Sequence, residues 1–150
     1  GWNTFSADIR ELIEVVRRTE LIERLERFSL KYIDLIQLEQ PPNLGCLNIA
    51  LQLGGQEIST APVQLRTEIK ESGILHIIQI VSPAEVAIPG EPRRYSGVLL
   101  DIDSINTFPE DGAWEEVDKQ LDAVHWASKK TFFNLLTPET IDRLVPEYQE

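Results

Sequence analysis

The 150-residue sequence predicts a single α+β domain over residues 1–150, in which a largely antiparallel sheet of about five strands packs against an N-terminal helix and C-terminal helices. Three observations predict this fold class. Helical periodicity is confined to the two ends of the chain, runs of strand length fill the middle, and most connections between those runs are as short as hairpin turns. A doubly wound parallel sheet would instead need helices between successive strands.

The first element is a helix predicted for residues 4–28. Its apolar residues follow the i, i+3, i+4 spacing of one buried stripe, namely Phe5, Ile9, Leu12, Ile13 and Val16. Ser6 is the expected N-cap, because its hydroxyl can accept a hydrogen bond from a free backbone N–H of the first turn. Glu14 and Arg18 stand at i, i+4 with the acid first, which favours an exposed face. Thr19 is a point at which the segment can divide into two helices.

Five strands are predicted in the middle of the chain: 27–38, 46–53, 63–70, 74–81 and 94–108. In the third strand, Val63, Leu65 and Ile69 alternate with polar residues, so one face lies in the core and the other in water. The first and fourth strands are apolar on both alternating sets, which is typical of strands covered on both faces. Because the helices are expected on one face, a missing N-terminal segment or a partner subunit would have to cover the second.

Glycine and proline mark the connections. Gly54–Gly55 is predicted to turn the chain, and residues 82–94, which include three prolines, are predicted to form a long irregular loop. A second helical pattern begins near residue 109, and Thr137 is expected to cap a last short helix that Pro146 ends. The apolar stripe of the second pattern consists of Trp114, Val117, Leu121, Val124, Ser128, Phe132 and Leu135.

Composition and charge restrict the function. The formal net charge is −11, so the chain lacks the basic footprint that nucleic acids and anionic membrane surfaces require. A basic protein partner or a cationic ligand stays open, as does the simpler interpretation that the charge keeps a cytoplasmic protein soluble. No stretch has the ~18 apolar residues of a membrane helix. The single cysteine, Cys46, is expected to be a small buried apolar residue, and motifs for phosphate, dinucleotide or metal binding are missing, so no cofactor or metal is predicted.

Residues 27–38 and 121–141 resemble an uncharacterised prokaryotic family whose members are sporadically distributed among genomes. In that family a helix introduced by a tryptophan precedes a strand of the form Arg-x-Gly-Leu-Arg-Tyr-Ile-Asn, and a C-terminal helix carries Leu-x-x-x-His with a downstream phenylalanine. The residues that fall on these positions are Trp2, Arg27, Leu30, Tyr32, Ile33, Leu121, His125, Phe132 and Thr137. Ser29, Lys31 and Asp34 depart from the family's glycine, arginine and asparagine.

Family members are longer at the N-terminus, so the resemblance implies that this chain is the C-terminal part of a longer protein. The family brings no established activity. Its sporadic distribution suits an accessory or defence-related role, which the resemblance implies only as an association.

His125 is the leading candidate for a polar role, because it lies four residues after Leu121 on the edge of the core stripe. As a functional group it would be an acid, a base or a ligand contact. As a structural group it would be a boundary histidine bonded to a backbone carbonyl or an acid. If a pocket lies between the sheet and the C-terminal helix, His125, Tyr32 and Asp101 would line it. Asp101 and Asp103 point to one side of a strand, but no third ligand stands at a metal-site spacing.

Two further features are candidates for partner binding. Trp126 and Phe133 stand at i, i+7 on a separate helix face with Lys130 beside them, and this stripe would either bind a partner or lie beneath an absent segment. Residues 101–122 include eight acids and one base, an acidic patch that suits a basic partner and is equally expected of a solvated face. His76, in an apolar strand, is expected to be a core histidine with one hydrogen bond.

The sequence therefore favours a non-enzymatic protein-interaction module, whose partner is another protein or a second copy of the chain. Missing catalytic motifs, the acidic patch and the surplus aromatic residues motivate this hypothesis. The alternative is a small-molecule binding protein or a hydrolytic enzyme with a pocket near His125. A third interpretation is a purely structural domain.

Overall fold

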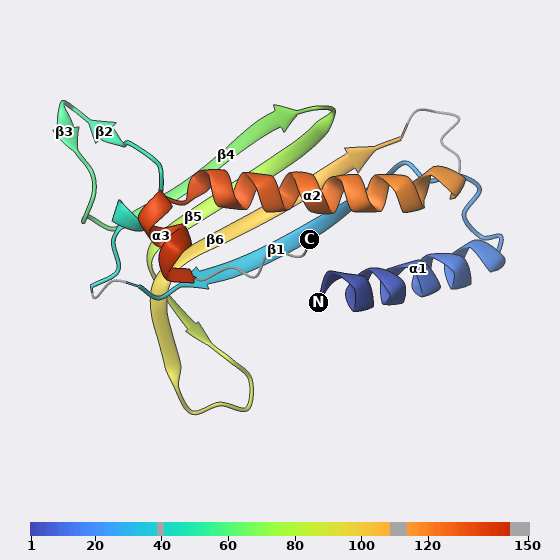
Figure 1. Cartoon of the computed structure of the whole chain (residues 1–150), viewed down its shortest axis with the longest axis horizontal. Coiled ribbons are helices and arrows are strands. Elements are labelled where there is room, and N and C mark those ends of the chain that lie inside the picture. The colour runs from blue at the N-terminus through green and yellow to red at the C-terminus, as the bar shows by residue number, and fades with distance from the viewer. Residues whose placement is uncertain (39–40, 109–113, 145–150) are drawn as a thin grey trace.

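The computed structural model describes residues 1–38, 41–108 and 114–144, and it has the α+β fold that the sequence predicts (Figure 1). The helices are α1 (Trp2–Arg18), α2 (Val117–Leu135) and α3 (Pro138–Leu144), together with the 3-10 turns η1 (Leu44–Cys46) and η2 (Trp114–Glu116). The strands are β1 (Arg27–Ile36), β2 (Gln52–Leu53), β3 (Gln56–Glu57), β4 (Val63–Glu71), β5 (Ile74–Ala87) and β6 (Arg94–Thr107).

Four strands form the main antiparallel sheet, in the order β1-β6-β5-β4. The short strands β2 and β3 pair separately around Gly54–Gly55, where both glycines have the positive φ angles that the predicted turn requires. The expectation of about five strands is thus met only roughly, as four long strands and one small hairpin.

The predicted strand at 46–53 is wrong over most of its length. Within that segment only Gln52 and Leu53 pair with a neighbouring strand over consecutive residues. Leu47 instead makes an isolated bridge to Leu136, and it is buried together with Cys46 against the C-terminal end of α2. An alternating apolar pattern therefore marks a segment that closes the end of the core rather than a strand of the sheet. The burial of Cys46, at 5% exposed, is as predicted.

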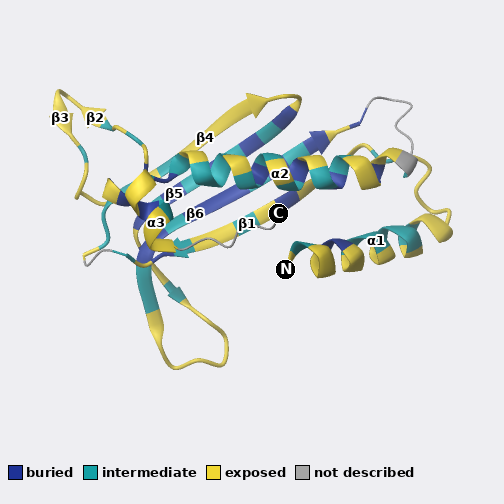
Figure 2. Ribbon diagram, in the orientation of Figure 1, coloured by how far each residue is buried: buried dark blue, intermediate teal, exposed yellow. Residues whose placement is uncertain are grey.

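The core lies between α2 and one face of the sheet (Figure 2). Burial alternates along β5 and β6, and Ile78, Leu100 and Ile102 are at most 1% exposed. The stripe predicted for the second helix is confirmed at its central positions, because α2 buries Val117, Leu121, Val124 and Ser128. Apolar side chains at this helical spacing hold α2 across the sheet, where it contacts β1, β5 and β6.

Beyond the main sheet, β5 and β6 continue as a long hairpin at the bottom of Figure 1. The irregular loop predicted for 82–94 is wrong, since β5 continues to Ala87 and β6 begins at Arg94. The ladder changes register around Pro83, and β4 pairs with β5 only as far as Ser82. On the side where β4 would pair, Pro83 has no neighbouring strand, so no hydrogen bond of the ladder requires the N–H that proline lacks. A strand tolerates proline at such a position.

The helix α1 begins earlier and ends sooner than predicted. It begins at Trp2, so Ser6 lies one turn inside it, buried, and its hydroxyl donates to the carbonyl of Asn3 instead of capping the helix. After Thr19 the chain is not helical before β1. Glu20 has a φ of 55°, a left-handed conformation that a right-handed helix cannot continue through.

The last helix starts as predicted. The Oγ1 of Thr137 accepts a hydrogen bond of 3.3 Å from the backbone N–H of Thr140, which confirms the expected cap of α3. The predicted helix start near residue 109 and the stop at Pro146 lie outside the described residues. In the part of the chain that the structure describes, no helix is both long and apolar enough to cross a membrane.

Candidate functional site

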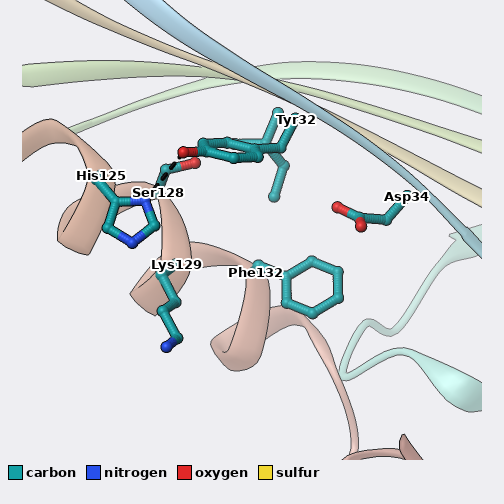
Figure 3. Close-up of a pocket in the computed structure, with 7 residues that line it drawn as sticks. Tyr32, Asp34, His125, Ser128, Lys129 and Phe132 are labelled. Atoms are coloured by element: carbon teal, nitrogen blue, oxygen red, sulfur yellow. Dashed lines mark hydrogen bonds between the residues drawn. The ribbon is translucent and has the colours of Figure 1, made fainter. Parts of the chain in front are cut away.

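A cavity of about 120 Å³ lies between β1 and α2 (Figure 3). Its lining consists of Tyr32, Asp34, Ile102, His125, Ser128, Lys129 and Phe132. Two of the three candidates from the sequence, Tyr32 and His125, meet here. Asp34 was missed as a site residue, although alternation gives the signal, because a residue two positions after Tyr32 in a strand points to the same face.

Aromatic side chains surround His125. Its Nδ1 lies 2.9 Å from the hydroxyl oxygen of Tyr32, and the ring of Trp2 stacks on the imidazole with centroids 3.8 Å apart and an interplanar angle of 3°. The ring of Trp126 lies 5.3 Å from the imidazole. A carbonyl or an acid was the expected structural partner of His125, and the observed partner is a tyrosine hydroxyl. His125 therefore joins α1, β1 and α2 in one cluster.

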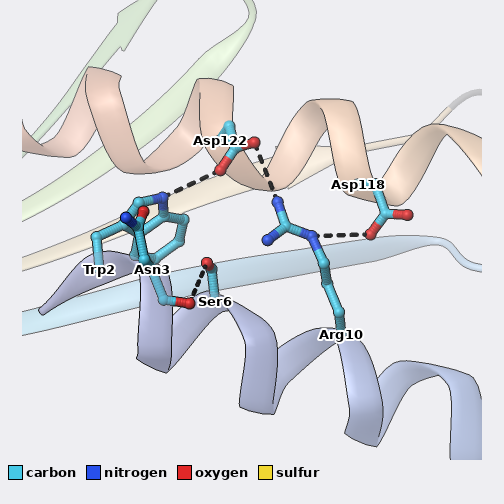
Figure 4. Close-up of polar contacts among 6 residues, drawn as sticks. All are labelled: Trp2, Asn3, Ser6, Arg10, Asp118 and Asp122. Atoms are coloured by element: carbon cyan, nitrogen blue, oxygen red, sulfur yellow. Dashed lines mark hydrogen bonds and ion pairs between the residues drawn. The ribbon is translucent and has the colours of Figure 1, made fainter.

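Polar contacts fasten α1 to α2 beside this cluster (Figure 4). The indole N–H of Trp2 donates to Asp122 at 3.0 Å, and Arg10 bonds the other carboxylate oxygen of Asp122 at 3.0 Å. Arg10 also pairs with Asp118 at 3.3 Å. These ion pairs are partly exposed, so each contributes little on its own. Trp2 and Ile9 also pack against the core cluster that contains Leu30 and Leu121, which holds α1 on the domain.

Burial changes the proton affinity of the groups around the cavity. Burial, with a smaller effect of the negative charge of Asp34, raises the pKa of Tyr32. Burial also raises the pKa of Asp34. The pKa of His125 is lowered by burial and then by Lys129, against an opposing effect of Asp122. A neutral His125 beside a protonated Tyr32 fits a hydrogen bond in which the tyrosine hydroxyl donates to Nδ1.

The lining of the cavity combines the carboxylate of Asp34, the amine of Lys129 and aromatic rings. Figure 3 shows the carboxylate of Asp34 directed toward the space between the rings of Tyr32 and Phe132. Hydrolysis would need a nucleophile that a base activates. Ser128 is 2% exposed, and within the described ranges no hydrogen bond joins it to His125.

Asp101 does not line this cavity, which corrects the expectation from the sequence. Its neighbour Ile102 lines the cavity, and side chains alternate along a strand, so Asp101 points to the opposite face of the sheet. There its carboxylate lies 2.9 Å from the amino group of Lys31. Asp103 lies on the same face, as predicted, and one of its carboxylate oxygens is buried without a hydrogen-bond partner.

The acids of residues 101–122 do not form one patch in the described part of this segment. Asp101 and Asp103 lie on the face of the sheet that points away from α2, whereas Asp118 and Asp122 lie on α2 and pair with Arg10. These acids are close in the sequence but separated in space, because β6 and α2 lie in different layers.

The predicted aromatic stripe on α2 is divided between different environments. Trp126 is 54% exposed, with the amino group of Lys129 5.0 Å above its ring. Phe133 is half-buried and packs against the core at the other end of the helix. Lys130 reaches across to β4, where it pairs with Glu71 at 2.5 Å. Of the three residues, only Trp126 presents a largely exposed aromatic surface.

A second candidate site is the face of the main sheet that points away from α2, which we call the open face. The ladder pairings place seven aliphatic side chains on it: Ile33, Leu35, Leu75, Ile77, Val81, Leu99 and Ile105. Ile33 is 61% exposed and the other six are half-buried. No helix in the described ranges packs on this face, since α2 occupies the other face and runs in front of the sheet in Figure 1.

Among the described residues, no group of three or more histidine, cysteine and acidic side chains is placed to hold a metal ion. Comparison with protein-family models, with curated proteins and with solved structures gave no significant match. Membership in the sporadically distributed family therefore stays a prediction.

Acid is expected to destabilise the protein through its two histidines. His76 is 1% exposed with its Nδ1 2.9 Å from the hydroxyl of Ser104, as predicted for a core histidine. Burial lowers the pKa of His76 and of His125 below the ordinary 6.5. Between those lowered values and 6.5 the unfolded chain binds more protons than the folded chain, so the free energy of unfolding falls as the pH falls through this window. Urea titrations at pH 7.5 and 5.5 measure the difference.

The variants His76→Asn and His125→Asn should each reduce this pH difference, and the double variant should reduce it most. For each variant, the quantity compared is the change in its free energy of unfolding between the two pH values, so a general loss of stability does not affect the comparison. An unchanged pH difference in the double variant would contradict the assignment.

Proposed function

We propose that this chain is a protein-interaction module whose partner packs on the open face. The observation that supports the proposal is the uneven cover of the main sheet. One face is buried by α2, while the other presents seven aliphatic side chains from the three adjacent strands β1, β6 and β5. Apolar surface gathered in this way is a common mark of a protein–protein interaction site.

The size of the open face fits a macromolecular partner. Four strands about 4.8 Å apart, each with about nine residues at roughly 3.3 Å, present on the order of 600 Å² in projection. A specific interface buries about 800 Å² of accessible surface on each partner, which is the same scale. The charge of the open face is also nearly balanced, although the chain carries −11. Its charged side chains are Arg27, Lys31, Arg66, Lys70, Glu68, Asp101 and Asp103.

A photoreactive group on the open face should therefore crosslink to a bound protein. The photoreactive amino acid p-benzoyl-phenylalanine replaces Ile33, which is exposed enough to accept it, and the chain is expressed in the organism that encodes it. We expect irradiation to give a discrete adduct of higher mass, read by immunoblot and mass spectrometry, because the group lies within the proposed interface.

The matched control carries the same amino acid in place of Leu53, which is 74% exposed and lies in β2, outside the main sheet. No discrete adduct is expected from this position. Equal adducts from both positions, or none from position 33, would overturn the proposal.

A further inference from the structure

We propose that the partner on the open face is a second copy of this chain, packed face to face about a two-fold axis that runs parallel to the strands. This inference rests on the proposed function and names its partner. Face-to-face packing of two sheets with strands within about 30° of each other is a common way to cover apolar sheet faces.

The pairing register of the sheet places opposite charges where such an axis needs them. Glu68, Ile77, Asp103 and Lys31 stand in one row across the four strands. Rotation about an axis parallel to the strands keeps each row and exchanges the edges, so β4 of one copy faces β1 of the other. Glu68 of each copy then faces Lys31 of the other, which would add two symmetric ion pairs to the Arg66–Glu68 and Lys31–Asp101 pairs within each chain.

The same rotation brings apolar side chains together at both ends of the interface. The central strands exchange places, so β5 of one copy faces β6 of the other. Leu75 then faces Ile105 of the second copy, and Val81 faces Leu99. These pairs lie in the two outer rows, and each occurs twice, so apolar surface would be buried on both sides of the polar inner rows.

The polar centre of the open face also gains a donor in this arrangement. Gln79 of the second copy faces Asp101 and is diagonal to Asp103, whose buried carboxylate oxygen has no hydrogen-bond partner within one chain. Ile77 of the second copy faces Asp103 itself, and the amide of Gln79 in the neighbouring row is the nearest donor to the acceptor that the single chain leaves unpaired. An unpaired buried acceptor is costly, and a donor from a second copy would remove that cost.

The other simple two-fold axis, perpendicular to the strands, fits worse. With this axis at the level of Ile102, β6 would lie against β6 in opposite directions, so Asp103 of each copy would face Asp101 of the other. Like charges that face each other across an interface disfavour association. Charge therefore selects the axis parallel to the strands.

The balanced charge of the open face lets two acidic chains approach there. Each chain carries −11, so contact through most of the surface would bring like charges together. The open face holds four basic and three acidic side chains, and it is thus a surface on which two copies meet without net repulsion. A basic partner would instead be expected on an acidic surface.

Sedimentation velocity of the full chain over a range of concentrations tests the proposal. We expect the wild-type chain to sediment as a dimer at tens of micromolar. The variant Ile33→Lys places a lysine opposite Arg66 of the second copy, and its dissociation constant should rise at least about tenfold. The control Leu53→Lys changes a residue of similar exposure outside the main sheet and should leave the dissociation constant unchanged.

A mixing experiment tests the axis itself. Glu68→Lys and Lys31→Glu should each weaken the homodimer, because each creates two like-charge contacts. Mixed in equal amounts, the two variants should form a heterodimer with wild-type affinity, because both of its contacts join opposite charges. Circular dichroism confirms that both variants are folded before mixing.

Failure of the mixed variants to associate would overturn the two-fold arrangement. A monomeric wild-type chain that still crosslinks from position 33 to a different protein would overturn the second copy as partner and leave the proposed function standing. A monomeric chain with no adduct from position 33 would overturn both.

Discussion

Replacing Ile102 with alanine is expected to lower the free energy of unfolding by about 3 kcal/mol. Ile102 is 0% exposed at the centre of the sheet, and it forms the floor of the cavity between β1 and α2. Removing three carbons from such a position loses their transfer free energy and leaves a void that the rigid ladders on both sides of β6 cannot close. Urea denaturation of the variant and the wild type measures the loss.

The control for this prediction is Leu53→Ala, which removes a side chain that is 74% exposed. A surface change of this kind should alter the free energy of unfolding by less than about 0.5 kcal/mol. If Ile102→Ala also fell within that limit, α2 would not be packed on the face of the sheet that carries Ile102, and the cavity would lose its floor.

Local patterns predict most of the sheet, because the spacing of apolar residues in each strand shows which of its faces is buried. The strands now seen as β1, β4, β5 and β6 begin at the predicted residues, and alternation along the chain shows which residues share a face. The segment at 46–53 shows the limit of this signal. An alternating apolar pattern reports that one side of a segment is buried, but it does not report whether a neighbouring strand is present to pair with it.

The long hairpin shows a second limit. Proline is a strong signal against a strand because it lacks a backbone N–H, and this signal predicted a loop at 82–94. Pro83, however, lies just beyond Ser82, the last residue of β5 that pairs with β4, so its missing donor has no effect on the ladder there. Whether a proline breaks a strand depends on which neighbours surround it, and the neighbours are a tertiary property.

The candidate site combines residues that the sequence could nominate but could not connect. Tyr32 and His125 are 93 residues apart, and their contact follows from the pairing of β1 with β6 and from the position of α2. Trp2 entered the sequence analysis only through the family resemblance, which placed all three residues on motif positions. Their side chains form one cluster in the structure. Asp101 was misplaced because its chemistry suited a pocket while the direction of its neighbour Ile102 was not yet known.

Replacing Trp2 with alanine is expected to detach α1 from the rest of the domain. The change removes the stacked ring on His125 and the hydrogen bond to Asp122, which together contribute about 2 kcal/mol. The remaining ion pairs of Arg10 are partly exposed and contribute little. Since an isolated helix of this length is marginal in water, α1 should unfold locally. Hydrogen exchange of its backbone amides should accelerate by at least about tenfold.

The control on the same helix is Leu12→Ala, because Leu12 is 62% exposed, which corrects its predicted place in the buried stripe, and its removal should leave the exchange of α1 unchanged. Trp2 and α1 contact the domain through α2 and the β1 edge, whereas the proposed dimer forms through the open face. Trp2→Ala should therefore accelerate exchange in α1 without altering the dissociation constant of the dimer. If exchange in α1 did not change, the stacked cluster would not be its anchor. If the dimer dissociated as well, the two sites would be coupled through β1, and the division of the molecule into a helix-covered face and an independent open face would be wrong.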